Sequence, residues 1–210
     1  MKHKGVLRLR GAARPYAQHE RKKTTPVRGE SFDRLRTGSA KAESNRDDEL
    51  LARAAKVRLL LLDVDGVLTD GRLYYGADGE VMKAYDVKDG HGLVLLRDHV
   101  QLGVISGRPG LSRKRLEDLR FQHMLFSQRD KLEGYAQLGH LGFADDEVAY
   151  MGDDVNDLGL LRKVGLSACP ADAHPAVRAA VHLVTATPGG RGAVRELVEL
   201  ILRAKGLWQY

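Results

Sequence analysis

Two acidic residues come directly after the first long apolar run of the chain. Residues 57–66 read VRLLLLDVDG, so Asp63 and Asp65 follow a segment typical of a buried parallel strand. Their i, i+2 spacing can aim both carboxylates the same way as the chain leaves the strand. Close like charges are costly unless a cation lies between them or one group holds a proton, which divides paired acids into nucleophile and proton donor. A solvated turn is the structural alternative, and the preceding apolar run weighs against it.

Two later strand ends supply groups that could bind phosphate. Ser106 and Arg108 follow the apolar segment QLGVI, and the turn through Gly107 offers a hydroxyl and backbone amides to phosphate oxygens. Lys131 follows the segment HMLF and Asp130, at a predicted helix start. Each signal is weak alone, because Ser-Gly is an ordinary turn and an isolated lysine is usually solvated.

A dense acidic loop follows the segment EVAYM. Asp153, Asp154 and Asp157 place three carboxylates within five residues. Oxygen ligands at this density suit Mg²⁺, which keeps several waters and takes one or two carboxylates together with phosphate. An acidic helix cap would explain Asp153 or Asp154 alone, but not the whole set. The sequence therefore predicts Mg²⁺ as the cofactor.

These residues need a framework that brings strand ends together. Apolar segments alternate with helical segments after residue 57, which predicts an α/β fold with a doubly wound parallel sheet, whose ligands lie beyond the carboxyl ends of the strands. Two β-rich arms around the turn at residues 76–79 predict a projecting hairpin flap. Helices are expected near residues 45–56, 92–98, 113–119, 132–141, 155–164, 174–180 and 193–204.

The order of these motifs resembles a known superfamily. Asp-x-Asp, Ser, Lys and Gly-Asp-Asp-x-x-Asp on successive strand ends resemble the haloacid dehalogenase superfamily over about residues 57–202. The segments LLLLDVDGVLTDG, KAYDVKDGHG, VGLSACPADAHPAV and GGRGAVREL are similar to those of the 3-deoxy-D-manno-octulosonate 8-phosphate phosphatases, which serve lipopolysaccharide synthesis in Gram-negative bacteria. This resemblance implies a Rossmann-like fold without a separate cap domain, and homotetramers that form through the flap.

The resemblance also implies roles for individual residues. Asp63 would attack phosphorus, and Asp65 would protonate the leaving group and then activate water. Ser106 and Lys131 would bind the transferring oxygens. The metal ligands would be Asp63, the backbone carbonyl of Asp65 and Asp153, with Asp154 or Asp157 acting through waters. The expected contacts to a sugar phosphate are Asp86, Lys88, Asp89, Gly90, Arg108 and Arg115, and Arg191 is expected to reach a neighbouring subunit's site.

The positive charge of the chain is unevenly distributed. The formal net charge is +6, and most of the excess lies before residue 45. Residues 1–44 show no sustained apolar period, so we predict a disordered basic extension there and a phosphatase domain over residues 45–210. A functional RNA- or membrane-binding arm is the alternative for the extension. We expect neither nucleic acid nor membrane as a partner of the catalytic body.

Cysteine content and hydropathy indicate the compartment. The single cysteine, Cys169, cannot form an intramolecular disulfide, and no stretch approaches the roughly 18 apolar residues of a membrane span. No apolar run of signal-peptide type occurs before Leu59. These features predict a cytoplasmic protein.

Two other functions fit part of the pattern. A phospho-acceptor module of the two-component receiver type also uses an aspartate, a hydroxyl, a lysine and Mg²⁺, but it lacks an acid two residues beyond the phosphorylated aspartate, and here Asp65 is present. A non-catalytic body with a working basic tail is less consistent with catalytic positions that are all filled. Within the enzyme hypothesis, a nine-carbon 2-keto-3-deoxy sugar phosphate is the alternative substrate.

Overall fold

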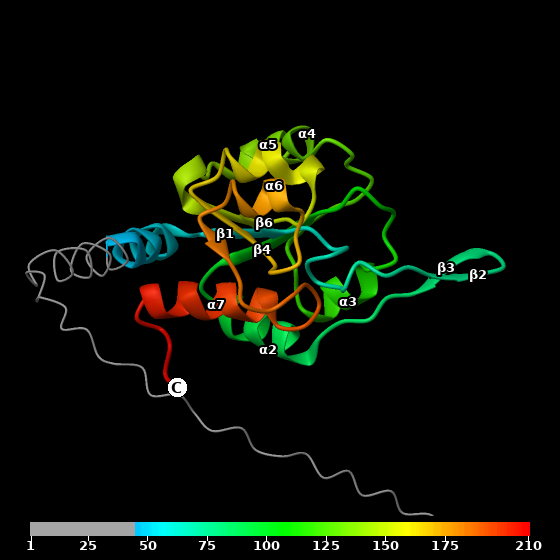
Figure 1. Ribbon diagram of the computed structural model, residues 1–210, viewed down its shortest axis with the longest axis horizontal. Coiled ribbons are helices and arrows are strands. Elements are labelled where there is room, and N and C mark those ends of the chain that lie inside the picture. Colours follow the sequence, from blue (N-terminus) through cyan, green and yellow to red (C-terminus); the bar gives the residue numbers. More distant parts are fainter. Residues whose placement is uncertain (1–44) are drawn as a thin grey trace, which may run out of the picture. The chain divides into compact units, whose positions relative to one another are not determined.

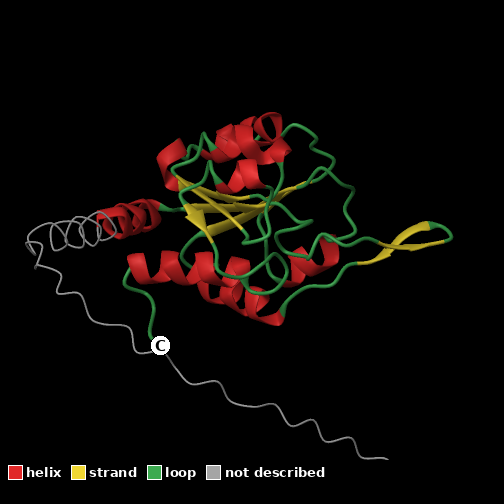
Figure 2. Ribbon diagram, in the orientation of Figure 1, coloured by secondary structure: helices red, strands yellow, loops and turns green. Residues whose placement is uncertain are grey.

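A parallel sheet between two helical layers forms the body of the protein (Figures 1 and 2). The computed structural model describes residues 45–210, and the predicted basic extension over residues 1–44 lies outside them. The sheet order is β5-β4-β1-β6-β7-β8 with every neighbouring pair parallel, which confirms the predicted α/β fold. The strands are β1 (Leu59–Leu62), β4 (Gln101–Ile105), β5 (His123–Leu125), β6 (Val148–Met151), β7 (Leu166–Cys169) and β8 (Leu183–Val184).

Helices cover both faces of this sheet (Figure 1). One face carries α2 (Val87–Leu96), α3 (Arg113–Asp118) and α7 (Ala193–Ala204). The other carries α4 (Lys131–Ala136), α5 (Leu158–Leu161) and α6 (Pro175–Arg178), and short 3-10 turns are η1 (Gly139–Leu141), η2 (Asp145–Glu147) and η3 (Val155–Asp157). A further helix over residues 45–56 precedes β1, as expected. Across residues 45–210, no helix has both the length and the hydropathy that crossing a bilayer requires.

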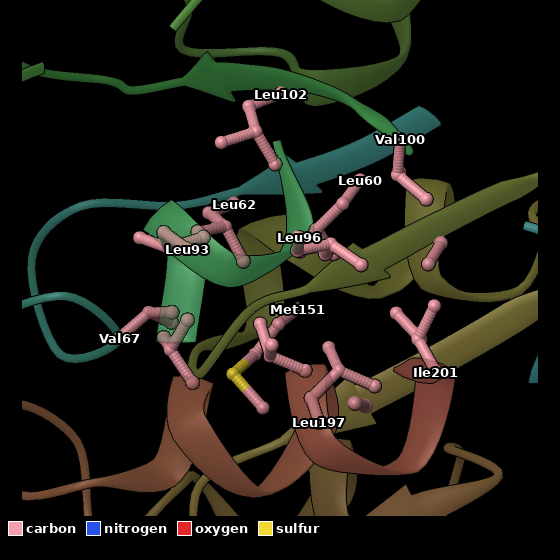
Figure 3. Packing of buried hydrophobic residues seen from close by; sticks show 14 of the residues in the cluster. Leu60, Leu62, Val67, Leu93, Leu96, Val100, Leu102, Met151, Leu197 and Ile201 are labelled. Carbon is pink, nitrogen blue, oxygen red and sulfur yellow. The ribbon is translucent and has the colours of Figure 1, made fainter. Parts of the chain in front are cut away.

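The four leucines of β1 divide between the two layers of the core. Leu60 and Leu62 pack in the cluster under α2 and α7, where Leu197 and Ile201 also lie (Figure 3). Leu59 and Leu61 join the second cluster on the opposite face. All four leucines are essentially inaccessible to solvent. A continuous apolar run was therefore the correct signal for a central strand that is buried on both faces.

The topology fixes where a ligand can bind. From β1 the chain moves through β4 to β5 on one side, and β6 then begins the other half on the opposite side of β1. The strand order reverses between β1 and β6, so a crevice opens at the carboxyl ends of these strands. Asp63 follows β1 and Asp153 follows β6, and both therefore lie at this crevice.

The predicted flap is present as a two-stranded hairpin, β2 (Tyr74–Gly76) and β3 (Gly79–Met82), which extends away from the body (Figure 2). Its side chains Tyr75, Val81 and Met82 are each more than half exposed. Within residues 45–210 this hairpin is the only sheet besides the central one, and no separate cap domain occurs in that range.

Helix α2 begins about five residues before its expected start near Gly92. The carboxylate of Asp86 caps the helix by accepting the backbone N–H of Lys88 at 2.6 Å. Glycine lowers helix propensity, which obscured this first turn in the sequence. At Gly90 a Cβ would lie 2.3 Å from Nη2 of Arg115, so a side chain there would displace the guanidinium. Tertiary packing therefore outweighs local propensity in this helix.

Two other expected helices are broken. The segment near residues 132–141 divides into α4 and η1, and the segment near residues 155–164 divides into η3 and α5. The turn η1 ends at Gly142, whose φ of 72° is left-handed and stops the helix. The η3 turn is tightened by acidic side chains of its own loop, which also form the site described next.

Candidate active site

A solvent-accessible cavity of about 250 Å³ lies at the switch point of the sheet. It is lined by residues from the loops after β1, β4 and β6, namely Asp63, Asp65, Gly71, Ser106, Gly107, Arg108, Asp153, Asp154 and Asn156. A larger and more apolar cavity of about 390 Å³ includes Leu59 and Val148, the first residues of β1 and β6, and therefore lies at the opposite edge of the sheet. Acidic side chains and candidate phosphate-binding groups line the smaller cavity, at the carboxyl ends of the strands.

Asp63 is held firmly at the floor of this crevice. Its backbone N–H donates to the Met151 carbonyl on β6 at 3.0 Å, which continues the pairing of the strands. Its Oδ1 lies 2.8 Å from the Lys131 ammonium. Burial raises the pKa of the Asp63 carboxyl to about 6, the ammonium of Lys131 opposes this rise, and the charge of Asp157 adds to it.

Lys131 supports Asp63 from inside the protein. Its side chain is 1% exposed, and its ammonium lies 2.7 Å from the Ile105 carbonyl and 3.4 Å from Oδ1 of Asp157. Together with Asp63, these groups surround the ammonium with oxygen atoms. Lys131 is not among the cavity-lining residues, so a phosphate oxygen would have to replace one of these acceptors. The structure thus brings it to the site behind Asp63 rather than in the open cavity.

Asp157 braces the acidic loop. It is fully buried, and its Oδ1 accepts the Tyr150 hydroxyl at 2.5 Å. Its Oδ2 accepts the backbone N–H groups of Asp153 at 3.0 Å and Asp154 at 3.1 Å. Both carboxylate oxygens of Asp157 are therefore engaged in holding the loop. The sequence had instead suggested that Asp157 acts on the metal through a water molecule. Burial and the nearby carboxylates raise the pKa of Tyr150 well above its usual value, so its hydroxyl stays protonated and donates.

Asp63, Asp153 and Asp157 bring three carboxylates close enough together to hold a metal ion. One carboxylate oxygen from each of Asp63, Asp153 and Asp157 lies within 4.8 Å of the others. Burial, followed by the charges of Asp63 and Asp157, raises the pKa of Asp153 to about 8. Clustered carboxylates in a buried setting are relieved by a cation, and an all-oxygen donor set suits a hard divalent ion. The residues present therefore fit Mg²⁺.

Gly66 makes room for this acidic cluster. Its φ is +84°, in the left-handed region, and a Cβ at this position would lie 2.1 Å from Oδ2 of Asp153. The loop after β1 and the loop after β6 can approach each other only because residue 66 has no side chain. The Gly in DVDG thus sets the separation of the two acidic loops.

Asp65 is tied to the base of the flap. Its Oδ1 forms an ion pair with Lys83, just beyond β3, and its Oδ2 lies 3.7 Å from Nε of Arg108. Glu80 lies between the same two cations, 2.9 Å from Lys83 and 2.9 Å from Arg108. The four side chains form a compact network of two acids and two bases at the cavity wall. Burial opposes the charged form of Lys83, but its hydrogen bonds to Asp65 and Glu80 raise its pKa above the usual value.

The residues expected to contact the sugar are spread over three elements. Asp86 caps α2, Lys88 is exposed in its first turn, and Arg115 of α3 lies against Gly90. Of this group, Arg108 alone lines the cavity. The structure therefore brings Arg108 to the acids and leaves Asp86, Lys88 and Arg115 outside the cavity wall.

Asp89 is occupied within the fold, in contrast to its expected substrate contact. The residue is 1% exposed, and its carboxylate accepts the backbone N–H of Gly192 at 3.2 Å and of Arg195 at 2.7 Å. These donors belong to the start of α7, which has no capping side chain of its own. Burial raises the pKa of Asp89 to about 6, although both N–H donors oppose the rise. Asp89 therefore joins α2 to α7, and its contact with substrate stays a prediction.

Arg191 is exposed on a tightly fixed loop. The neighbouring Gly190 donates its N–H to the Val67 carbonyl at 3.0 Å. A Cβ at Gly189 would lie 1.8 Å from the Gly66 carbonyl, so this loop packs directly against the loop after Asp63. Arg191 is thereby presented beside the site but outside its cavity lining.

Known proteins share this arrangement. Residues 123–197 match the family model of the haloacid dehalogenase-like hydrolases. The 3-deoxy-D-manno-octulosonate 8-phosphate phosphatase of Yersinia pestis is 44% identical over 161 residues, which cover 75% of this chain and 86% of that protein. The chain belongs to this phosphatase family. It is a phosphoric monoester hydrolase of the haloacid dehalogenase type.

Solved structures agree with this assignment of the phosphatase. The Yersinia pestis enzyme superposes with a TM-score of 0.74 at 43% identity, over 76% of this chain and 88% of that one. A 3-deoxy-D-manno-octulosonate 8-phosphate phosphatase from Moraxella catarrhalis, in complex with magnesium, phosphate and the sugar, has a TM-score of 0.73 at 35% identity and covers 76% of this chain and 93% of its own. A relative from Haemophilus influenzae was solved in a cobalt-bound form.

Three residues of this phosphatase's site carried no clear signal in the sequence. Lys83 stands in the segment KAYDVKDGHG, whose resemblance to the family could have marked it, but it follows a flap strand rather than a core strand. Glu80 lies on the flap itself. Tyr150 lies inside β6, where an aromatic residue indicates core packing. Their roles depend on tertiary contacts that spacing does not reveal.

Replacing Asp89 by alanine in the phosphatase should lower stability more than it lowers substrate affinity. Loss of a buried cap costs about 2 kcal/mol, because two N–H groups at the start of α7 lose their acceptor. For a chain of this size, the melting temperature should fall by roughly 4–8 °C, as measured by thermal denaturation. Asp98→Ala, at an exposed position, is the matched control. An unchanged melting temperature with a strongly raised KM would instead favour a substrate contact.

Proposed function

We propose that this phosphatase hydrolyses 3-deoxy-D-manno-octulosonate 8-phosphate to 3-deoxy-D-manno-octulosonate and phosphate, through a phosphorylated Asp63 and with Mg²⁺. The observation that carries the proposal is the buried Asp63, fixed by Lys131 and joined by Asp65 and Asp153 in one cavity. The 44% identity to the Yersinia pestis enzyme supports the choice of substrate. The reaction would belong to lipopolysaccharide precursor synthesis.

In the first step, an oxygen of the Asp63 carboxylate attacks phosphorus in line with the leaving sugar oxygen. The bond from phosphorus to that oxygen breaks, and Asp65 gives its proton to the departing alkoxide. Lys131 holds Oδ1 of Asp63, which orients the carboxylate for attack. The products of this step are the free sugar and an acyl phosphate on Asp63.

In the second step, water attacks the same phosphorus. Asp65, now a carboxylate, accepts a proton from this water, and the bond from phosphorus to Asp63 breaks. Inorganic phosphate leaves, and both aspartates return to their starting protonation states. The same residue serves as acid and then as base because it lies two positions beyond the nucleophile on one loop.

Asp63, Asp153 and the backbone carbonyl of Asp65 would hold Mg²⁺, with Asp154 acting through a water molecule. Bound there, the ion supplies positive charge that offsets the phosphate oxygens and the cluster of carboxylates. Asp157 contributes by fixing the loop that carries Asp153. Ser106 lines the cavity, and its hydroxyl is available to a transferring oxygen.

The sugar would be recognised around Arg108. Its guanidinium lies at the cavity wall and suits the carboxylate of an acidic sugar. Lys88 and Arg115 would extend this positive surface, with Asp86 and Gly90 shaping the segment, and Arg191 would act on the site of a neighbouring subunit. A nine-carbon 2-keto-3-deoxy sugar phosphate carries the same carboxylate and remains the alternative substrate.

We expect a cytoplasmic homotetramer. The flap exposes Tyr75, Val81 and Met82, and a two-stranded hairpin has little stability by itself. Exposed apolar side chains on a projecting hairpin are typical of a protein–protein contact. Light scattering on the full chain should give a mass four times that of a single chain.

A phosphate-release screen across sugar phosphates, with and without Mg²⁺, tests the proposed function. The eight-carbon acidic sugar phosphate should give the highest kcat/KM, hexose phosphates should react far more slowly, and chelation should abolish turnover until Mg²⁺ is restored. Faster turnover of the nine-carbon substrate would select the alternative. Absence of phosphate release from either acidic sugar, or full activity in chelator, would contradict the proposal.

A further inference from the structure

Apart from Lys131, Lys83 is unusual among the lysines of residues 45–210, because its side chain is almost fully buried although it lies at the base of an exposed hairpin. The side chain is 2% exposed, whereas the ion-paired Lys114 on α3 is 83% exposed. Burying an ammonium is costly unless acceptors surround it. Asp65 and Glu80 supply these acceptors, so the contact with Asp65 defines the position of Lys83.

The contact is specific to one carboxylate of the site. Lys83 pairs with Oδ1 of Asp65, while Oδ2 of Asp65 faces Nε of Arg108 at 3.7 Å. The Asp65 carboxylate is thus held from two sides. Asp63 and Asp153, by contrast, are held by Lys131 and by the loop that Asp157 braces. The flap network therefore acts on the proton-transfer residue and leaves the nucleophile to another support.

Glu80 completes the arrangement. It lies 2.9 Å from both Lys83 and Arg108, so it fixes both cations against the flap and balances their charge. With Glu80 present, two acids face two bases. Lys83 can therefore remain buried at the cavity wall without an excess of charge. This balance fits a rigid support for Asp65.

We infer that Lys83 is a positioning residue that holds the Asp65 carboxylate in the geometry for proton transfer to the leaving oxygen and from water. The inference rests on the proposed function and adds to it a residue from the flap. A misplacement of a reacting group by about 1 Å can cost roughly 100-fold in rate. Loss of the Lys83 ammonium should therefore lower kcat rather than substrate affinity.

The test is a double-mutant cycle on the full chain with 3-deoxy-D-manno-octulosonate 8-phosphate and Mg²⁺. Lys83→Met should reduce kcat by about 100-fold and change KM by less than about threefold. In the Asp65→Asn background, the same change should cost less than about threefold, because Lys83 acts through Asp65. Lys114→Met, which breaks an exposed lysine–aspartate pair on α3, is the matched control and should retain wild-type activity.

Circular dichroism and thermal melting establish that each variant is folded, and Lys83→Gln replaces Lys83→Met in the cycle if the latter does not fold. Additive losses in the cycle, or a Lys83 variant as active as Lys114→Met, would overturn the inference. Inactivity of the wild-type chain on both acidic sugar phosphates would contradict the proposed function instead. The two failures are therefore distinguishable.

Discussion

Asp63→Asn is expected to abolish turnover while leaving the fold intact. An amide is a poor nucleophile for phosphorus, so kcat should fall by at least about 10⁴-fold. The amide oxygen can still accept the hydrogen bond from Lys131 that Oδ1 accepts at 2.8 Å in the wild type. The variant also removes a buried acid whose pKa burial has raised, so its melting temperature should not decrease.

Phosphate release and circular dichroism measure the two halves of this prediction. Asp98→Asn makes the same chemical change at an exposed position after α2 and should behave as the wild type. Mass spectrometry of acid-quenched wild-type enzyme should detect one phosphoryl group on the peptide that contains Asp63, and none in the variant. Mg²⁺-dependent turnover of Asp63→Asn within tenfold of the wild type would eliminate Asp63 as the nucleophile.

Asp65→Asn is expected to slow both chemical steps. An asparagine cannot donate a proton to the leaving alkoxide or accept one from water, and general acid–base catalysis contributes about 10²–10⁴-fold. The amide preserves the size of the side chain beside Lys83 and Arg108, so the cavity wall should remain in place. The loss should therefore appear mainly in kcat.

Rapid-quench kinetics with labelled substrate separate formation of the phosphorylated enzyme from its breakdown. In Asp65→Asn both rate constants should fall. Normal breakdown of the intermediate would contradict the role of Asp65 in the second step. A wild-type phosphorylated protein that persists for minutes would favour a receiver-like signalling module over a phosphatase.

The reactive residues that follow the strands could be predicted from the sequence, because the path of the backbone determines where these residues lie. An apolar run long enough to be buried on both faces ends at Leu62, and the next residue must lie at the sheet edge. Parallel strands place all such ends on the same side. The sequence therefore predicted that Asp63, Ser106 and Asp153 meet at one edge of the sheet.

The contacts that hold these groups were not predictable in the same way. Asp89 caps a helix that begins more than a hundred residues later in the chain, and Lys83 lies between two acids that only the folded flap brings together. Lys131 was expected to face phosphate, but its ammonium is surrounded by acceptors inside the protein. Side-chain type and spacing show which groups can react, whereas long-range packing decides which groups support them.

The position of α7 has a consequence for folding. Val194, Leu197, Val198 and Ile201 complete the core cluster that also contains Leu60 and Leu62 of β1. Helix α7 follows every strand of the sheet along the chain, so one face of the sheet stays uncovered until this helix docks. An exposed apolar face at this stage favours aggregation. A folding intermediate in which α7 has not yet docked therefore presents an apolar surface, and docking of this helix closes the core.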